Sequence, residues 1–67
     1  MKDIKKNFGE DIRKLRSQKW FSQEEFARKC WVHRTYMGLI ERGETNITLE
    51  NIAKIAKALE ISIKELF

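Results

Sequence analysis

Apolar residues in the N-terminal third of the chain recur at spacings of three and four positions. The stripe consists of Ile4, Phe8, Ile12 and Leu15. This spacing places the apolar side chains on one face of an α-helix, while the lysines and arginines between them fall on the other faces. The pattern predicts a first helix from about Ile4 or Asn7 to Gln18.

Two shorter helices are indicated in the middle of the chain. Ser22 followed by Glu25 is a capping-box pattern, which opens a helix that should end near Cys30. A third helix is expected from about His33 to just before Gly43, whose backbone freedom suits a helix C-terminus. The apolar or small residues that would fix the angle between these two helices are Phe26, Ala27, Val32, Met37 and Ile40.

The C-terminal third predicts one more full helix and a final turn. Thr48 is a good N-cap residue for the full helix. The apolar face that we expect in the core consists of Leu49, Ile52, Ile55, Ala56 and Leu59. Ser62 with Glu65 repeats the capping pattern and opens a last helical turn from Ile63 to Phe67. Together these elements predict an all-α fold, a compact five-helix bundle in a single domain of residues 1–67.

Length and cysteine content narrow the class of protein. The chain has 67 residues, no proline and three glycines, which favours helices and leaves room for one domain. The single cysteine, Cys30, excludes an internal disulfide and suits packing in a reducing cytoplasm. The N-terminus lacks the apolar stretch of a signal peptide, and no apolar run has the length of a membrane span. We expect a soluble, cytoplasmic protein with no membrane partner.

Positive charge is concentrated in the N-terminal half. The formal net charge is +4. Residues 1–34 contain ten lysines and arginines against five acidic residues, whereas residues 35–67 contain four against five. A basic half that includes the first helix and the two short helices suits a surface that follows DNA phosphates. The alternative is an ordinary solvated, lysine-rich surface.

The residues expected of an enzyme or a metalloprotein are missing. The only histidine, His33, has no cysteine or serine partner at a recognisable catalytic spacing. The chain has no zinc-ligand cluster and no glycine-rich phosphate loop. We therefore expect no enzymatic activity, no cofactor and no metal. The sequence gives no sign of a small-molecule pocket and leaves small-molecule control open.

The predicted third helix carries side chains that suit DNA reading. The planar guanidinium of Arg34 can donate two hydrogen bonds to O6 and N7 of guanine. Thr35 can bond a base or touch a thymine methyl group, and Leu39, one turn along, offers apolar contact only. Because the major groove admits an α-helix, these positions predict a sequence-reading DNA-binding module. The alternative for a single exposed arginine is a solvated charge.

The sequence closely resembles small helix-turn-helix regulators typified by phage repressors and Xre-like proteins. The resemblance covers about residues 8–67 and rests on FGEDIRKLR, SQEEFA, HRTYMGLIERGE, NITLENIAKIAKAL and SIKELF. The combination of HRTY, IERGE and N-x-T-L is especially similar to controller proteins of restriction–modification systems, which regulate transcription as homodimers. The resemblance implies a repressor-like bundle and a regulator whose partner is double-stranded DNA.

The resemblance also implies roles for individual positions. The base-contacting residues would be His33, Arg34, Thr35 and Leu39. The phosphate-contacting residues would be Gln23, as a cap of the second helix, together with Tyr36, Arg42, Thr45 and Asn46. For His33, capping of the third helix is the alternative role.

An apolar C-terminal tail suggests a twofold homodimer. The tail consists of Ile61, Ile63, Leu66 and Phe67. Too little chain follows to cover these side chains, and the resemblance points to the same arrangement. Two recognition helices about 34 Å apart would then read successive major grooves of an inverted repeat. In the alternative, the tail closes the core of a single chain.

Two tryptophans depart from the resemblance. The family usually has glycine at the turns where this chain has Trp20 and Trp31. A bulky residue forced to positive φ there costs about 1–3 kcal/mol unless the turn changes. One hypothesis is an engineered variant or an altered turn geometry. The other is a natural sequence whose turns adopt ordinary φ and leave both indoles half-buried.

A protein-interaction module on the same fold is the rival function, as in an antitoxin or an adaptor. Its apolar tail or its tryptophans would bind a protein partner, because tryptophan is favoured at binding hot spots. Binding by such a module would be little affected by Arg34→Ala, whereas DNA reading would be lost. A third possibility is a preserved fold in which Trp31 impairs sequence-specific binding.

Overall fold

The structure is a computed structural model that describes residues 3–66, and these residues are all helix, turn or loop. Its elements are α1 (Ile4–Gln18), α2 (Gln23–Lys29), α3 (Arg34–Arg42), α4 (Leu49–Leu59) and the 3₁₀ turn η1 (Ile63–Leu66). The all-α prediction is confirmed, but the predicted fifth helix is wrong. In the last segment the N–H of Glu65 donates to the carbonyl of Ser62, three positions earlier, at 3.0 Å, so this segment is a single 3₁₀ turn.

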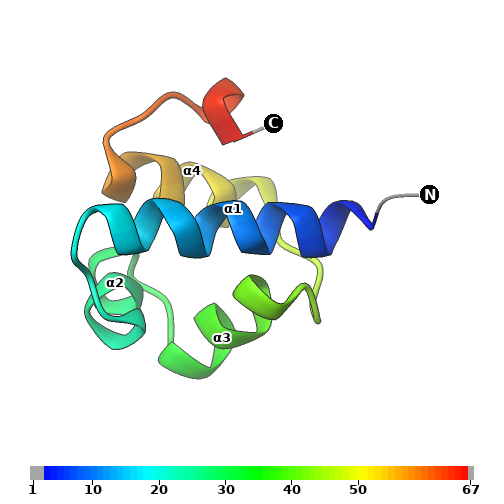
Figure 1. The fold of residues 1–67 in the computed structure, drawn as a ribbon, viewed down its shortest axis with the longest axis horizontal. Coiled ribbons are helices and arrows are strands. Elements are labelled where there is room, and N and C mark those ends of the chain that lie inside the picture. Colours follow the sequence, from blue (N-terminus) through cyan, green and yellow to red (C-terminus); the bar gives the residue numbers. More distant parts are fainter. Residues whose placement is uncertain (1–2, 67) are drawn as a thin grey trace.

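In Figure 1, α1 crosses the middle of the molecule, with α2 and α3 below it and α4 and η1 above. The core lies where these helices meet. Its largest fully buried side chains are Phe26, Ile12, Met37, Ile55, Leu59 and Cys30. Cys30 therefore packs as the sequence predicted, and burial raises the pKa of its thiol to about 12, which keeps it neutral.

Helices α2 and α4 start after the predicted capping residues. Ser22 and Glu25 form a reciprocal capping box at α2. Thr48 accepts the N–H of Asn51 at the start of α4. At α1 the cap is Asp3, whose carboxylate accepts the N–H groups of Lys5 and Lys6 and so sets the start at Ile4. Local hydrogen bonds thus account for the helix starts.

All four α-helices within residues 3–66 end in the same backbone motif. Each is followed by a left-handed residue, and the N–H of the next residue donates to the carbonyl five positions earlier, at 2.9–3.3 Å. The left-handed residues are Trp20 (φ 65°), Trp31 (61°), Gly43 (70°) and Glu60 (60°). Only Gly43 adopts this conformation without a steric penalty, as predicted. The alternative of ordinary φ with half-buried indoles is wrong, because Trp20 is 92% exposed and Trp31 is 85% exposed.

Leu49 corrects the prediction for the fourth helix. Ile52, Ile55, Ala56 and Leu59 are buried as expected, but Leu49 is 81% exposed. Leu49 is the first residue of α4, directly after the cap, where a side chain points back toward the helix N-terminus rather than onto the helix body. The buried face of α4 therefore begins one turn later, at Ile52.

A close backbone approach joins α1 to α3. A Cβ atom at Gly9 would lie 2.2 Å from the carbonyl oxygen of Ile40 and 2.7 Å from that of Glu41. Both are main-chain atoms of α3, so no flexible side chain can move aside to make room. Glycine at this position sets how closely the two helices pack.

We expect Gly9→Ala to lower the free energy of unfolding by about 2 kcal/mol, because the added methyl group must push the two helices apart. Urea denaturation followed by circular dichroism measures the loss. A matched Ala53→Ser change, at an exposed position in α4, should leave stability within about 0.5 kcal/mol. Equal stability of Gly9→Ala and the parent chain would show that the contact is looser than the structure indicates.

Candidate nucleic-acid interface

A buried ion pair connects α3 to α1 and α2. Arg16 of α1 donates to both carboxylate oxygens of Glu41, Nε to Oε2 at 2.7 Å and Nη2 to Oε1 at 3.0 Å. Its third donor, Nη1, binds the carbonyl of Phe21 at 2.9 Å. Gln23 of α2 donates to the same carboxylate at 3.1 Å. Glu41, a residue that is only 8% exposed, thus connects α1, α2 and α3.

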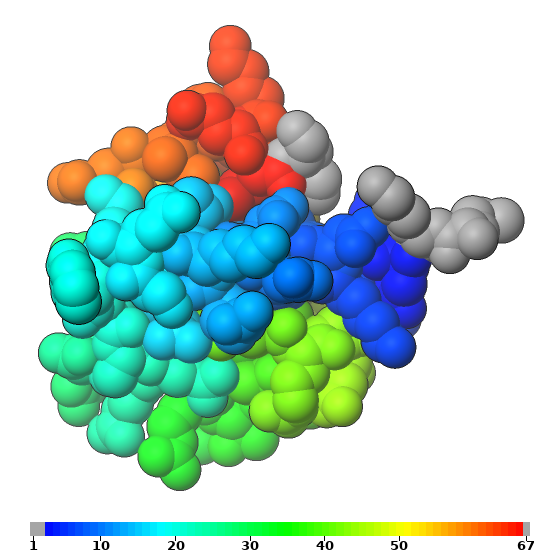
Figure 2. All heavy atoms as spheres, in the orientation of Figure 1, coloured from blue at the N-terminus to red at the C-terminus, as the bar shows by residue number. Residues whose placement is uncertain are grey.

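Apolar packing adds to this connection. Phe26 and Ala27 of α2 and Met37 and Ile40 of α3 are buried, as the sequence predicted, and Val32 between them is half-buried. Two short helices connected by the 30–33 turn and held by a shared core form a helix-turn-helix arrangement. The second of these helices, α3, forms the lower, protruding edge of the molecule, green in Figure 2.

The predicted base-contacting residues gather at the start of α3. His33 is the N-cap, and its Nδ1 accepts the N–H of Thr35 at 3.0 Å. Its capping role is therefore confirmed, and in the neutral ring the remaining proton lies on Nε2. Arg34 and Thr35 are exposed, and Leu39 is half-buried one turn further along. The Arg34 guanidinium lies 3.3 Å from Glu24 of α2.

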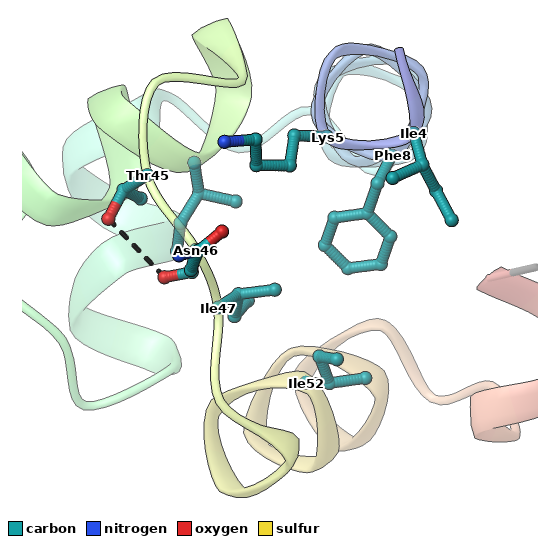
Figure 3. Close-up of a pocket in the computed structure, with 8 residues that line it drawn as sticks. Ile4, Lys5, Phe8, Thr45, Asn46, Ile47 and Ile52 are labelled. Atoms are coloured by element: carbon teal, nitrogen blue, oxygen red, sulfur yellow. Dashed lines mark hydrogen bonds between the residues drawn. The ribbon is translucent and has the colours of Figure 1, made fainter. Parts of the chain in front are cut away.

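The predicted phosphate-contacting residues divide into two groups. Arg42 and Asn46 are exposed and Thr45 is half-buried, at the end of α3 and in the loop that follows. Arg42 pairs with Glu44 at 2.9 Å, and the Thr45 hydroxyl donates to the carbonyl of Asn46 at 3.3 Å. In Figure 3, Lys5 extends its ammonium group toward this loop, across a hollow of about 360 Å³. Positive charge is therefore present beside the loop.

Gln23 and Tyr36 form the second group, and both are engaged inside the protein. The structure corrects the expectation that Gln23 caps α2, because Ser22 is the cap and the Gln23 amide faces Glu41. The Tyr36 hydroxyl accepts a hydrogen bond from Asn51 at 3.1 Å. That contact occupies an oxygen lone pair and leaves the hydroxyl proton for another acceptor.

The C-terminal tail is partly a core element. Leu66 is 4% exposed, which favours the alternative that the tail closes the core of a single chain. Ile61 is half-buried against the core, and Ile63 is 44% exposed. Phe67 lies outside the described residues. Of the predicted interface, Ile63 offers the most apolar surface that the structure describes.

The sequence patterns did not identify Arg16 and Glu41, the pair that connects α1 to α3. A signal was present, since Arg16 lies four positions after Ile12 and Glu41 four positions after Met37, in phase with buried residues. A charged residue at helical spacing from buried apolar residues lies on the buried face of its helix, where it needs a partner of opposite charge. The described residues contain no group of three or more potential metal ligands and no helix able to cross a membrane.

Comparison with known proteins identifies the class of this arrangement. A family model described as helix-turn-helix matches residues 12–66. The chain belongs to the helix-turn-helix family. Among curated relatives it is 46% identical over 65 residues to the control protein C.BamHI of Bacillus amyloliquefaciens, covering 96% of this chain and 80% of the relative. It is also 46% identical to the control protein C.MunI of a Mycoplasma species, covering 100% and 92%.

Solved structures of helix-turn-helix proteins agree. The restriction–modification controller protein C.AhdI from Aeromonas hydrophila matches with a TM-score of 0.90 and 45% identity, over 92% of this chain and 94% of that one. SinR, a master regulator for biofilm formation solved in complex with DNA, matches with a TM-score of 0.83 and 32% identity, over 88% and 95%. This helix-turn-helix protein is accordingly a transcription regulator similar to controller proteins, not an enzyme.

Proposed function

We propose that the chain recognises a specific operator by placing the N-terminal half of α3 in the DNA major groove. The observation that carries this proposal is the exposure of Arg34 and Thr35 at the start of a helix that the Arg16–Glu41 pair holds in place. A base-reading side chain needs such a fixed platform, because hydrogen bonds to base edges tolerate little displacement.

Each base-contacting residue has a distinct role in this proposal. Arg34 leaves Glu24 and donates two hydrogen bonds to a guanine, at small cost since the pair is exposed. Thr35 contacts the adjacent base, and Leu39 packs against a thymine methyl group. His33 keeps its capping bond and donates from Nε2 to a neighbouring acceptor.

Phosphate contacts set the register of α3 in the groove. Arg42, Thr45 and Asn46 approach one strand, with Lys5 beside them. Tyr36 donates its hydroxyl proton to a phosphate, and the second amide hydrogen of Gln23 does the same. These contacts supply salt-dependent affinity without reading sequence.

A homodimer would place two copies of α3 on an inverted repeat, with half-site centres about 34 Å apart. Ile61, Ile63 and Phe67 are the residues we assign to the interface, whereas Leu66 is buried in the core of the single chain. The similarity to controller proteins suggests that the single-domain chain acts in the cytoplasm on a restriction–modification operator.

Selection of duplexes from a random pool at near-physiological salt tests the proposal. We expect an enriched inverted repeat that contains a guanine in each half-site. Arg34→Ala should relax that position and weaken the selected site by about 1–3 kcal/mol per half-site. Lys14→Ala, on the exposed face of α1, is the control and should weaken all sequences slightly and equally. Retention without any enriched motif would contradict the proposal.

An adaptor function is the second candidate, favoured by the exposed indoles of Trp20 and Trp31. It predicts binding of a protein partner that survives Arg34→Ala but is lost in Trp20→Gly or Trp31→Gly. The duplex selection distinguishes the two candidates, since an adaptor would return no enriched sequence.

A further inference from the structure

A hollow between α2 and α4 gathers positive charge around an exposed indole. It is lined by Lys29, Cys30, Trp31, Lys54, Lys57 and Ala58, and has a volume of about 310 Å³. We call it the α2–α4 hollow. The volume falls at the lower end of the range for small-molecule sites, about 300–1,000 Å³. None of these residues belongs to the proposed DNA contacts.

The charge of the hollow is poorly neutralised. Lys54 pairs with Glu50 at 3.7 Å. Among residues 3–66, however, Lys29 and Lys57 have no carboxylate within ion-pair distance. Lys29 lies 5.5 Å from the centre of the Phe21 ring, which attracts the cation without cancelling its charge. Cys30 adds no negative charge, because its buried thiol stays protonated at neutral pH. Like charges around one concavity favour an anion there.

Trp31 supplies a flat apolar wall. Its backbone adopts the left-handed conformation although the residue is 85% exposed. Packing of the indole within the chain therefore offsets little of the backbone strain. Strain alone does not single out Trp31, because Trp20 has the same backbone conformation and similar exposure. What distinguishes Trp31 is its position beside the lysines, since Trp20 is not part of this hollow.

We propose that the α2–α4 hollow binds a small flat anion, whose ring stacks on the Trp31 indole and whose acidic group lies between Lys29 and Lys57. Stacking on an indole and charge-assisted hydrogen bonds to ammonium groups are independent contributions, and together they select this class of ligand. A nucleoside monophosphate and an aromatic carboxylate share this chemistry. The site goes beyond the proposed DNA recognition and does not depend on it.

Single-tryptophan variants allow a direct test. Trp20→Gly leaves Trp31 as the only tryptophan, and Trp31→Gly leaves Trp20, so the two variants are matched in backbone change and in exposure. Indole fluorescence is titrated with adenosine monophosphate and with benzoate at fixed ionic strength. Adenosine and inorganic phosphate serve as probes that each carry one half of the proposed ligand.

We expect saturable quenching of Trp31 by at least one of the two anions, and only weak, linear quenching of Trp20. The anion that binds more tightly shows whether the natural ligand is a nucleotide or an aromatic carboxylate. In the Trp20→Gly background, Lys29→Gln with Lys57→Gln should weaken binding about tenfold or more. Lys64→Gln, on η1 and outside the hollow, should not change it.

Three results would overturn the proposal. The first is equal, unsaturable quenching of both tryptophans, or no quenching by either anion. The second is saturable binding that the two lysine substitutions leave unchanged. The third is quenching of Trp31 by duplex DNA alone, which would make the hollow part of the DNA surface.

Discussion

Glu41→Ala is expected to destabilise the fold by about 3–5 kcal/mol, because it leaves the Arg16 guanidinium buried without its partner. Arg16 is held by three hydrogen bonds, of which two end on Glu41. The loss is a large part of the total of about 5–15 kcal/mol that stabilises a small domain. Urea denaturation should show a chain that is largely unfolded or close to it.

The double variant Arg16→Met with Glu41→Leu separates the cost of an unpaired charge from the value of the pair. Apolar residues of similar volume often replace a buried ion pair at little cost. We expect the double variant to recover most of the stability lost in Glu41→Ala. Glu10→Gln is the control, since the Lys14–Glu10 pair is exposed and contributes well under 1 kcal/mol. A double variant as unstable as Glu41→Ala would contradict this account.

The same double variant bears on DNA recognition. Arg16, Gln23 and Glu41 connect three helices through directional hydrogen bonds, which apolar contacts do not reproduce. A stable double variant with weakened operator binding would indicate that the ion pair holds the recognition helix at its working angle. Operator binding equal to that of the parent chain would assign that role to the shared apolar core instead.

Local features of the chain were largely predictable from the sequence. The capping residues Ser22 and Thr48 and the C-terminal Gly43 act within a few positions of themselves, so their patterns set helix ends correctly. The exposed positions Arg34 and Thr35 follow from the same local periodicity. The family resemblance added the repressor-like arrangement of the helices and the likeness to controller proteins, which periodicity alone does not contain.

Features that depend on distant partners were not predictable. The Arg16–Glu41 pair joins residues 25 positions apart, and the need for Gly9 depends on the main chain of α3. Leu49 shares the apolar period of α4 but lies before the core begins. The conformation at Glu60 was also missed, because the left-handed backbone there is set by the helix end rather than by the residue type.

Replacing three left-handed residues by glycine is expected to stabilise the protein by about 2 kcal/mol in total. The variant combines Trp20→Gly, Trp31→Gly and Glu60→Gly. Each L-residue in this conformation costs about 1–2 kcal/mol, and the extra freedom of glycine in the unfolded chain takes back about 0.4–1 kcal/mol. Little packing is lost, because both indoles are exposed and the Lys19–Glu60 pair is a weak surface contact of 3.9 Å.

Thermal unfolding measures the gain, and about 2 kcal/mol corresponds to a rise in Tm of roughly 8–16 °C for a domain of this size. The matched control is Ala53→Gly, which places glycine at an exposed position inside α4 and should cost about 1 kcal/mol. If the triple variant is more stable than the parent chain and Ala53→Gly is less stable, the gain comes from relief of backbone strain. A destabilised triple variant would mean instead that the indoles pack usefully.

The stability gained by Trp31→Gly is expected to be accompanied by a loss of anion binding. The substitution removes the indole wall of the α2–α4 hollow but leaves α3 unchanged. Operator binding should therefore persist in the triple variant while anion binding is lost.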